Sequence, residues 1–224
     1  MSQPPSNLSA VDALTRLREG NRRYSQNVRS VDSLVSHSRR DLSLQSPVAV
    51  VLGCSDSRAP AEIVFDQGLG DLFVIRVAGN IVAPSQVGSV EFAIERFDTR
   101  LVIVMGHTLC GAIDATLEAI KSAQRPPSQG MGSIVNRVRP AIEALVHTSL
   151  AENPDQLRRE AIRANVRASV NHLRHGSEVI ERLTLDEGLL VVGAELDLST
   201  GEVTFLDGAA DLAPLRGEGG RAAY

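Results

Sequence analysis

The feature that most constrains this fold is an apolar run, Val48–Leu52, that ends at Gly53. Three of its five residues are valine, which is typical of a strand buried on both faces in a helix-covered parallel sheet. A thiol, a carboxylate and a guanidinium follow at alternate positions: Cys54, Asp56 and Arg58. Because open α/β sheets bind ligands beyond the carboxyl ends of their strands, this pattern predicts a functional site there.

A second apolar run, residues 101–106, also ends in reactive side chains, His107 and Cys110. Cys54 and Cys110 are the two cysteines of the chain, and both follow strands. Catalytic zinc is held by three protein ligands, and two thiolates with one imidazole are such a set. His107 and Cys110 are three residues apart at the start of an expected helix, which predicts that both side chains lie on one side. Two buried apolar cysteines with a hydrogen-bonded histidine are the less favoured interpretation.

Asp56 and Arg58 have two possible roles beside such a metal. The carboxylate of Asp56 could occupy the fourth coordination position, because it is only two residues from Cys54. Arg58 could instead hold Asp56 in a bidentate pair and keep it off the metal. Without the cysteines, an ordinary surface ion pair would be preferred.

The order of expected elements predicts an α/β fold: a mainly parallel central sheet with an antiparallel edge strand, flanked by helices, with an N-terminal helical arm. The helix at 9–25 could pack on a neighbouring subunit or cover its own domain. We expect one domain over 1–224, with an N-terminal arm and loop at 1–45, a catalytic core at 46–207 and a loose tail at 208–224. Strands are expected at 48–53, 72–77, 101–106, 189–196 and 203–206, and further helices at 60–65, 86–97, 111–123, 133–149 and 155–184.

Composition excludes several classes of partner. The net charge of −4 favours neither nucleic acid nor an anionic membrane. No apolar run reaches the ~18 residues of a membrane helix, and the polar N-terminus lacks a signal-peptide pattern. We therefore expect a cytoplasmic protein. Tryptophan is absent and aromatics total 3%, which favours a small substrate over a large one.

The two motifs together resemble the β-class carbonic anhydrases, in their plant-like branch and of bacterial type. The resemblance rests on Cys54-Ser55-Asp56-Ser57-Arg58 and, about fifty residues later, on residues 106–112, Gly-His-Thr-Leu-Cys-Gly-Ala. The segments 73–80 and 88–93 between them are similar to the connecting segments of that family. The resemblance covers roughly residues 10–206.

The resemblance implies a role for each matching residue. Cys54, His107 and Cys110 would hold one zinc ion per subunit, and Asp56 and Arg58 would form the catalytic dyad. Asp56 would be a fourth ligand only in a closed state. Five further residues match substrate-binding positions: Gln45, Phe73, Ala78, Phe92 and Gly111. Phe92 stands where many relatives have tyrosine, and Val51 stands where a tryptophan of a second, inhibitory bicarbonate site would be.

The implied activity is reversible hydration of carbon dioxide to bicarbonate and a proton, by attack of a zinc-bound hydroxide. The resemblance also implies a homodimer or a dimer of dimers with the active site at the subunit interface. One alternative is hydrolysis of carbonyl sulfide or carbon disulfide at the same zinc site. Two others are a zinc-stabilised binding module without catalysis, and a hydrolase with Cys54 as nucleophile and His107 as base.

Overall fold

A computed structural model describes residues 8–28, 45–122 and 126–206. Its core is a five-stranded sheet in the order β2-β1-β3-β4-β5. The strands β1 (Ala49–Gly53), β2 (Leu72–Arg76), β3 (Leu101–His107) and β4 (Leu190–Leu196) are parallel, and β5 (Val203–Phe205) runs antiparallel to β4 at the edge. This confirms the predicted fold class. Of the expected N-terminal arm and loop at 1–45, residues 1–7 and 29–44 lie outside the described residues, as does the expected tail at 208–224.

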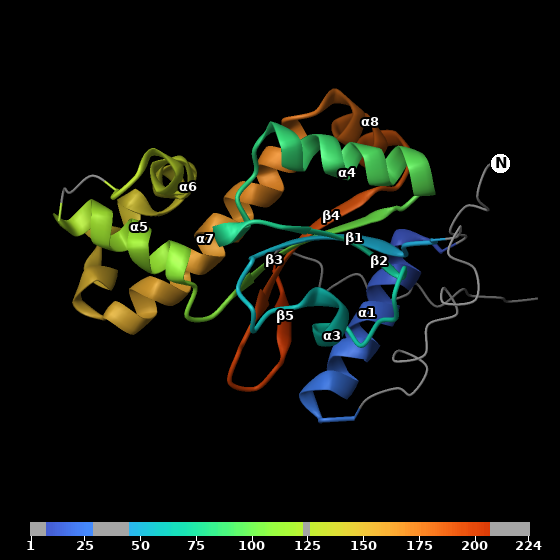
Figure 1. The fold of residues 1–224 in the computed structure, drawn as a ribbon, viewed down its shortest axis with the longest axis horizontal. Helices are drawn as coiled ribbons and strands as arrows, with labels where there is room; N and C mark the ends of the chain where they lie inside the picture. The colour runs from blue at the N-terminus through green and yellow to red at the C-terminus, as the bar shows by residue number, and fades with distance from the viewer. Residues whose placement is uncertain (1–7, 29–44, 123–125, 207–224) are drawn as a thin grey trace, which may run out of the picture.

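Helices cover both faces of the sheet (Figure 1). On one face α1 (Ala10–Ser25) and α3 (Ala61–Val64) pack on strand residues such as Val51 and Ile103. On the other face α4 (Pro84–Phe97), α7 (Pro154–His175) and α8 (Glu178–Asp186) pack on Val50 and Val102. Successive strand side chains point to opposite faces, so an unbroken apolar run such as β1 supplies both layers.

A third apolar cluster lies beyond the carboxyl end of the sheet. It is built by α5 (Gly111–Ser122), α6 (Gln129–Ile142), the first half of α7 and two short 3₁₀ turns, η3 (Glu143–His147) and η4 (Ser149–Glu152). Figure 1 shows α5 and α6 set to one side of the sheet. Both cysteines belong to this cluster, so the candidate site lies where the sheet meets the helical extension.

The N-terminal helix α1 covers its own domain. Leu14 and Leu17 are fully buried in the core cluster on that face of the sheet. A Cβ at Gly20 would lie 1.8 Å from the Phe65 carbonyl oxygen, so only glycine permits this packing distance. The sequence had left open whether this helix covers its own domain or packs on a neighbouring subunit; the structure shows the first of these, and a contact with a neighbouring subunit stays a prediction.

Two expected helices are shorter in the structure than the sequence pattern suggested. The prediction of one helix over 155–184 is wrong: α7 ends at His175, and α8 begins after Ser177. The Ser177 hydroxyl accepts the Ile180 N–H as an N-cap and donates to Glu91 on α4 at 2.6 Å, so a new helix starts at this serine. Similarly, α6 begins at Gln129 and ends at Ile142, with 3₁₀ turns following up to Glu152.

Candidate metal centre

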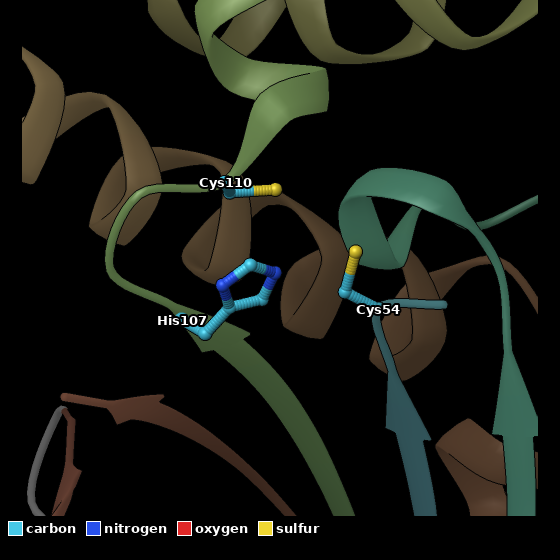
Figure 2. Close-up of side chains that lie close together, drawn as sticks. All are labelled: Cys54, His107 and Cys110. Carbon is cyan, nitrogen blue, oxygen red and sulfur yellow. The ribbon is translucent and has the colours of Figure 1, made fainter. Parts of the chain in front are cut away.

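Three side chains from two neighbouring strand ends converge at the edge of the sheet. Cys54 directly follows β1, His107 is the last residue of β3, and Cys110 directly precedes α5. The ligating atoms of the three residues all lie within 4.8 Å of one another (Figure 2). All three residues are buried. The structure therefore brings together the three predicted ligands, which are separated by up to 56 residues in the sequence.

The strand register explains why Cys54 and His107 meet. Gly53 pairs with Met105, so Cys54 follows β1 at the level of Gly106, one residue before His107 ends β3. The chain moves from β1 outward to β2 and then returns to β3 on the other side of β1. Such a reversal of strand order opens a crevice at the carboxyl edge, which is where α/β sheets place ligands.

Cys110 reaches the site through a tight turn and not through a helix. The sequence suggested that His107 and Cys110 share the first turn of a helix, and this is wrong because His107 is still in β3. Leu109 between them has a left-handed backbone with φ 57°, an uncommon conformation for a leucine. This turn folds Cys110 back beside His107, and the Cys110 carbonyl then accepts the first N–H bonds of α5.

The imidazole of His107 is oriented for ligation through Nε2. Its Nδ1 lies 2.9 Å from the Thr108 carbonyl oxygen, which assigns the proton to Nδ1. Nε2 is buried and has no hydrogen-bond partner among the described residues. A buried polar atom without a partner costs free energy, and a metal ligand bond would satisfy it.

The sulfur atoms of Cys54 and Cys110 lie within 4.8 Å of each other. The nearby Cys110 thiol lowers the pKa of Cys54, and the nearby Cys54 sulfur together with burial raises the pKa of Cys110. Burial lowers the pKa of His107, but the nearby Cys54 thiolate and the Thr108 carbonyl outweigh burial, and the pKa rises. The site thus carries a thiolate and concentrates negative charge, which suits a cation.

Asp56 is held next to this site by Arg58. The Arg58 Nε and Nη2 donate to the two carboxylate oxygens at 2.9 and 2.7 Å, and its backbone N–H donates to Oδ1 at 2.9 Å. These bonds hold the pKa of the Asp56 carboxyl well below its usual value. Arg58 Nη2 also donates to the Leu109 carbonyl at 3.2 Å, which connects the loops after β1 and β3.

The residues present fit a zinc ion. Two sulfurs and one imidazole nitrogen are typical donors of catalytic zinc, and the ligands of a tetrahedral zinc are about 3.5–4 Å apart. A spacing within 4.8 Å needs only small side-chain rotations to reach that geometry. Asp56 does not close the set, because both of its oxygens are bound by Arg58. The arrangement therefore supports a metal centre with one open position.

Only some of the other predicted residues lie beside this centre. Gly111 begins α5 directly after Cys110, and Ala78 begins the 3₁₀ turn η2 (Ala78–Asn80), which contacts Cys54. Gln45 is exposed and precedes β1, at the opposite end of that strand from Cys54. The structure does not bring Gln45 to this chain's own metal centre.

Phe73 and Phe92 also lie away from the metal centre of their own chain. Phe73 pairs with Val50, four residues and about 13 Å of strand before Cys54. The ring centroids of Phe73 and Phe92 are 6.1 Å apart, and Phe97 is 6.0 Å from each. Phe92 is 55% exposed, so this aromatic cluster reaches the surface beside the edge strand β2.

Two residues that contact the site, Gly79 and Arg76, are not predicted from the sequence. The backbone N–H of Gly79 donates to Cys54 Sγ at 3.4 Å. Arg76, at the end of β2, donates to the carbonyls of Cys54 and Asp56 at 3.0 and 2.6 Å and so fixes the loop between them. The sequence marked Ala78-Gly79-Asn80 only as a tight connection, and nothing in it indicated the role of Arg76.

Comparisons with known proteins agree with this geometry. A family model described as carbonic anhydrase matches residues 49–203. Carbonic anhydrase 2 of Mycobacterium tuberculosis is 34% identical over 204 residues, which cover 90% of this chain and 95% of that protein. The solved β-carbonic anhydrase CcaA superposes with a TM-score of 0.68 at 26% identity, covering 88% of this chain and 89% of that one. One of two tetrameric β-carbonic anhydrases of Sordaria macrospora has a TM-score of 0.63 at 22% identity, with coverage of 75% and 88%.

Proposed function

This chain belongs to the β-carbonic anhydrase family, and we propose on that basis that it hydrates carbon dioxide reversibly to bicarbonate and a proton, with zinc as cofactor. The observation that carries the proposal is the buried Cys54–His107–Cys110 set, whose ligating atoms lie within 4.8 Å of one another. The bidentate hold of Arg58 on Asp56 supports an open coordination position. A structural zinc site would usually be closed by a fourth protein ligand.

Cys54, His107 and Cys110 would hold the ion. When bound, zinc supplies a Lewis acid that activates water at neutral pH. Asp56 stays ionised under these conditions because Arg58 keeps its pKa low, so it can only accept hydrogen bonds. In the proposed mechanism the carboxylate accepts the hydrogen of the attacking water and turns a lone pair toward the carbon of carbon dioxide. One C–O bond forms, and one proton leaves for the solvent.

The residues around the centre support binding of a small, nonpolar substrate. Gly111 starts α5, and its N–H belongs to the first turn, where backbone donors have no partner within the helix. We propose that this N–H stabilises the developing bicarbonate oxygen. Ala78 is exposed at the start of the turn next to Cys54 and matches an apolar substrate-binding position of the family.

The remaining substrate residues would come from a second copy of the chain. Gln45, Phe73 and Phe92 match substrate-binding positions of the family but do not lie at the metal centre of their own chain. Phe92 is exposed and packs on Phe73 of β2, which is an edge strand of the sheet formed by the described residues, and such a position suits an interface. We therefore propose a homodimer or a dimer of dimers with the active site at the subunit interface. Loss of activity on dilution, in parallel with dissociation measured by light scattering, is the expected result.

The reaction is tested with purified, zinc-loaded protein. Stopped-flow hydration of carbon dioxide is expected to be fast, while carbonyl sulfide and carbon disulfide serve as comparison substrates. Preference for either sulfur compound would replace the proposal with the hydrolase alternative, and zinc binding without turnover of any of them would favour a binding module. Among the described residues, no helix has both the length and the apolar character needed to cross a bilayer. We propose a cytoplasmic location, which fractionation would test.

A further inference from the structure

Two polar residues are buried on the core-facing side of α7. Asn165 and Ser169 are 2% and 5% exposed, and their neighbours on that side, Val166, Ile162 and Val170, are apolar. Asn165 and Ser169 are four residues apart and therefore follow each other along one face of the helix. An amide buried in apolar surroundings is costly unless it is hydrogen-bonded, so the partners of these residues indicate what they do.

Both side chains bind the same short turn. The Asn165 amide Nδ2 donates to the Gly79 carbonyl at 2.8 Å, and the Ser169 hydroxyl donates to the Asn80 carbonyl at 3.1 Å. The turn η2 contains two consecutive left-handed residues, Gly79 with φ 70° and Asn80 with φ 43°. Its carbonyls therefore need partners from outside the turn, and α7 supplies them.

The turn η2 contacts the metal centre through Gly79. The N–H of Gly79 donates to Cys54 Sγ at 3.4 Å, while the carbonyl of the same residue is bound by Asn165. A Cβ at Gly79 would lie 3.1 Å from the Ala112 Cβ, so the turn also packs tightly on α5. The two bonds of Gly79 thus fix its backbone between α7 and the ligand sulfur. Figure 2 shows Cys54 beside this teal turn, with brown helical segments behind.

A hydrogen bond to a ligand sulfur reduces the electron density that the sulfur donates to a metal. The metal then remains a stronger Lewis acid, and such outer contacts tune bound water as well as the ligand. The strength of this effect depends on the geometry of the N–H···S hydrogen bond and on how rigidly the protein keeps that geometry. In this structure the direction of the Gly79 N–H depends on Asn165, because Asn165 binds the carbonyl oxygen of the same glycine.

We propose that Asn165 is a positioning residue for the metal centre: through the Gly79 carbonyl it aims the Gly79 N–H at Cys54 Sγ and so keeps the metal electrophilic. The inference rests on the proposed zinc site. It concerns a residue 111 positions from Cys54 along the chain, on a helix that contributes no ligand.

The experiment compares the cobalt(II)-substituted wild type with Asn165→Leu, which keeps the approximate volume and removes the donor. Loss of the hydrogen bond raises the energy of the sulfur electrons, so the sulfur-to-cobalt charge-transfer band is expected to move to longer wavelength. The acid limb of the kcat/KM profile of the zinc enzyme is expected to move to higher pH, because the metal activates water less. If the leucine variant does not fold, Asn165→Ser, whose side chain is too short to reach the Gly79 carbonyl, undergoes the same comparison.

The matched control is Thr99→Val. Thr99 is fully buried and donates to the Pro47 carbonyl at 3.0 Å, at the amino end of β1. This variant also loses one buried bond to a backbone carbonyl, but its band and pH profile should equal those of the wild type. The proposal is overturned if the Asn165 variant matches the wild type in both readouts, or if the control moves as far. If the wild type shows no such band, the zinc site itself is refuted, and this inference with it.

Discussion

Arg58 binds both carboxylate oxygens of Asp56, and it leaves Oδ2 of Asp56 4.0 Å from Nε2 of His107. The carboxylate therefore lies beside the ligand set without completing it. The guanidinium and the backbone N–H of Arg58 both hold it in this orientation, and the Nη2 of Arg58 also donates to the Leu109 carbonyl. At the proposed zinc site, the fourth coordination position would then depend on this exposed arginine.

Arg58→Ala is expected to close the metal site. Without the guanidinium, Asp56 is free to rotate onto the metal, and the open position is lost. Activity should fall by about 10- to 100-fold, in the range known for contacts that orient metal ligands. X-ray absorption at the zinc edge should show an additional oxygen ligand from Asp56.

The matched variant is Arg58→Ala combined with Asp56→Asn. The amide is a weaker ligand than a carboxylate, so the extra coordination should disappear although activity stays low. An Arg58→Ala protein with unchanged coordination and normal turnover would show that Arg58 does not control the site.

Cys54→Ser is expected to abolish tight zinc binding. The side chain is nearly isosteric, but the alcohol is not deprotonated at neutral pH and is a poor ligand for zinc. Zinc content, measured by atomic emission after dialysis, should fall well below one ion per chain, and hydration activity should fall with it. A variant that keeps both zinc and activity would refute the ligand assignment.

Metal binding is expected to release about one to two protons at neutral pH. The lowered pKa of Cys54 leaves it as a thiolate before the metal arrives, and the raised pKa of Cys110 means that its proton must be displaced. His107, whose pKa is raised, adds a further fraction. Protons compete with the metal, so affinity should decrease as pH falls. Titration calorimetry in two buffers of different ionisation enthalpy measures the number of protons released, and release of three protons would show that Cys54 is not a thiolate before the metal binds.

Gly20→Ala is expected to lower the free energy of unfolding by about 2 kcal/mol or more. The new Cβ would lie 1.8 Å from the Phe65 carbonyl oxygen, so α1 could not remain packed against this backbone. Denaturant unfolding of the metal-free protein measures the change.

Gly88→Ala is the control for this prediction. Gly88 lies within α4, and nothing lies within 4 Å of the position where its Cβ would be. Alanine should raise the free energy of unfolding by about 0.5–1 kcal/mol through its helix propensity. Equal effects at both glycines would contradict the packing of α1 described above.

Helix ends were the least accurate part of the predictions from sequence. The apolar periodicity across residues 155–184 did not distinguish one helix from two, because Gly176 and Ser177 interrupt it only briefly. What separates α7 from α8 is the Ser177 hydroxyl, which caps α8 and binds Glu91 from a different part of the chain. A contact over 86 residues leaves no local pattern in the sequence.

The sequence by itself determined the parallel sheet, the antiparallel edge strand and the three residues proposed as metal ligands. These follow from local patterns, since unbroken apolar runs form buried strands and the residues after such runs emerge at one edge of the sheet. Only the tertiary structure decided that Leu109 turns Cys110 back to His107, that Asn165 and Gly79 support Cys54, and that Gln45 lies at the far end of its own strand. Each of these depends on a backbone direction or on a contact between distant segments, and both are fixed only when the whole chain packs.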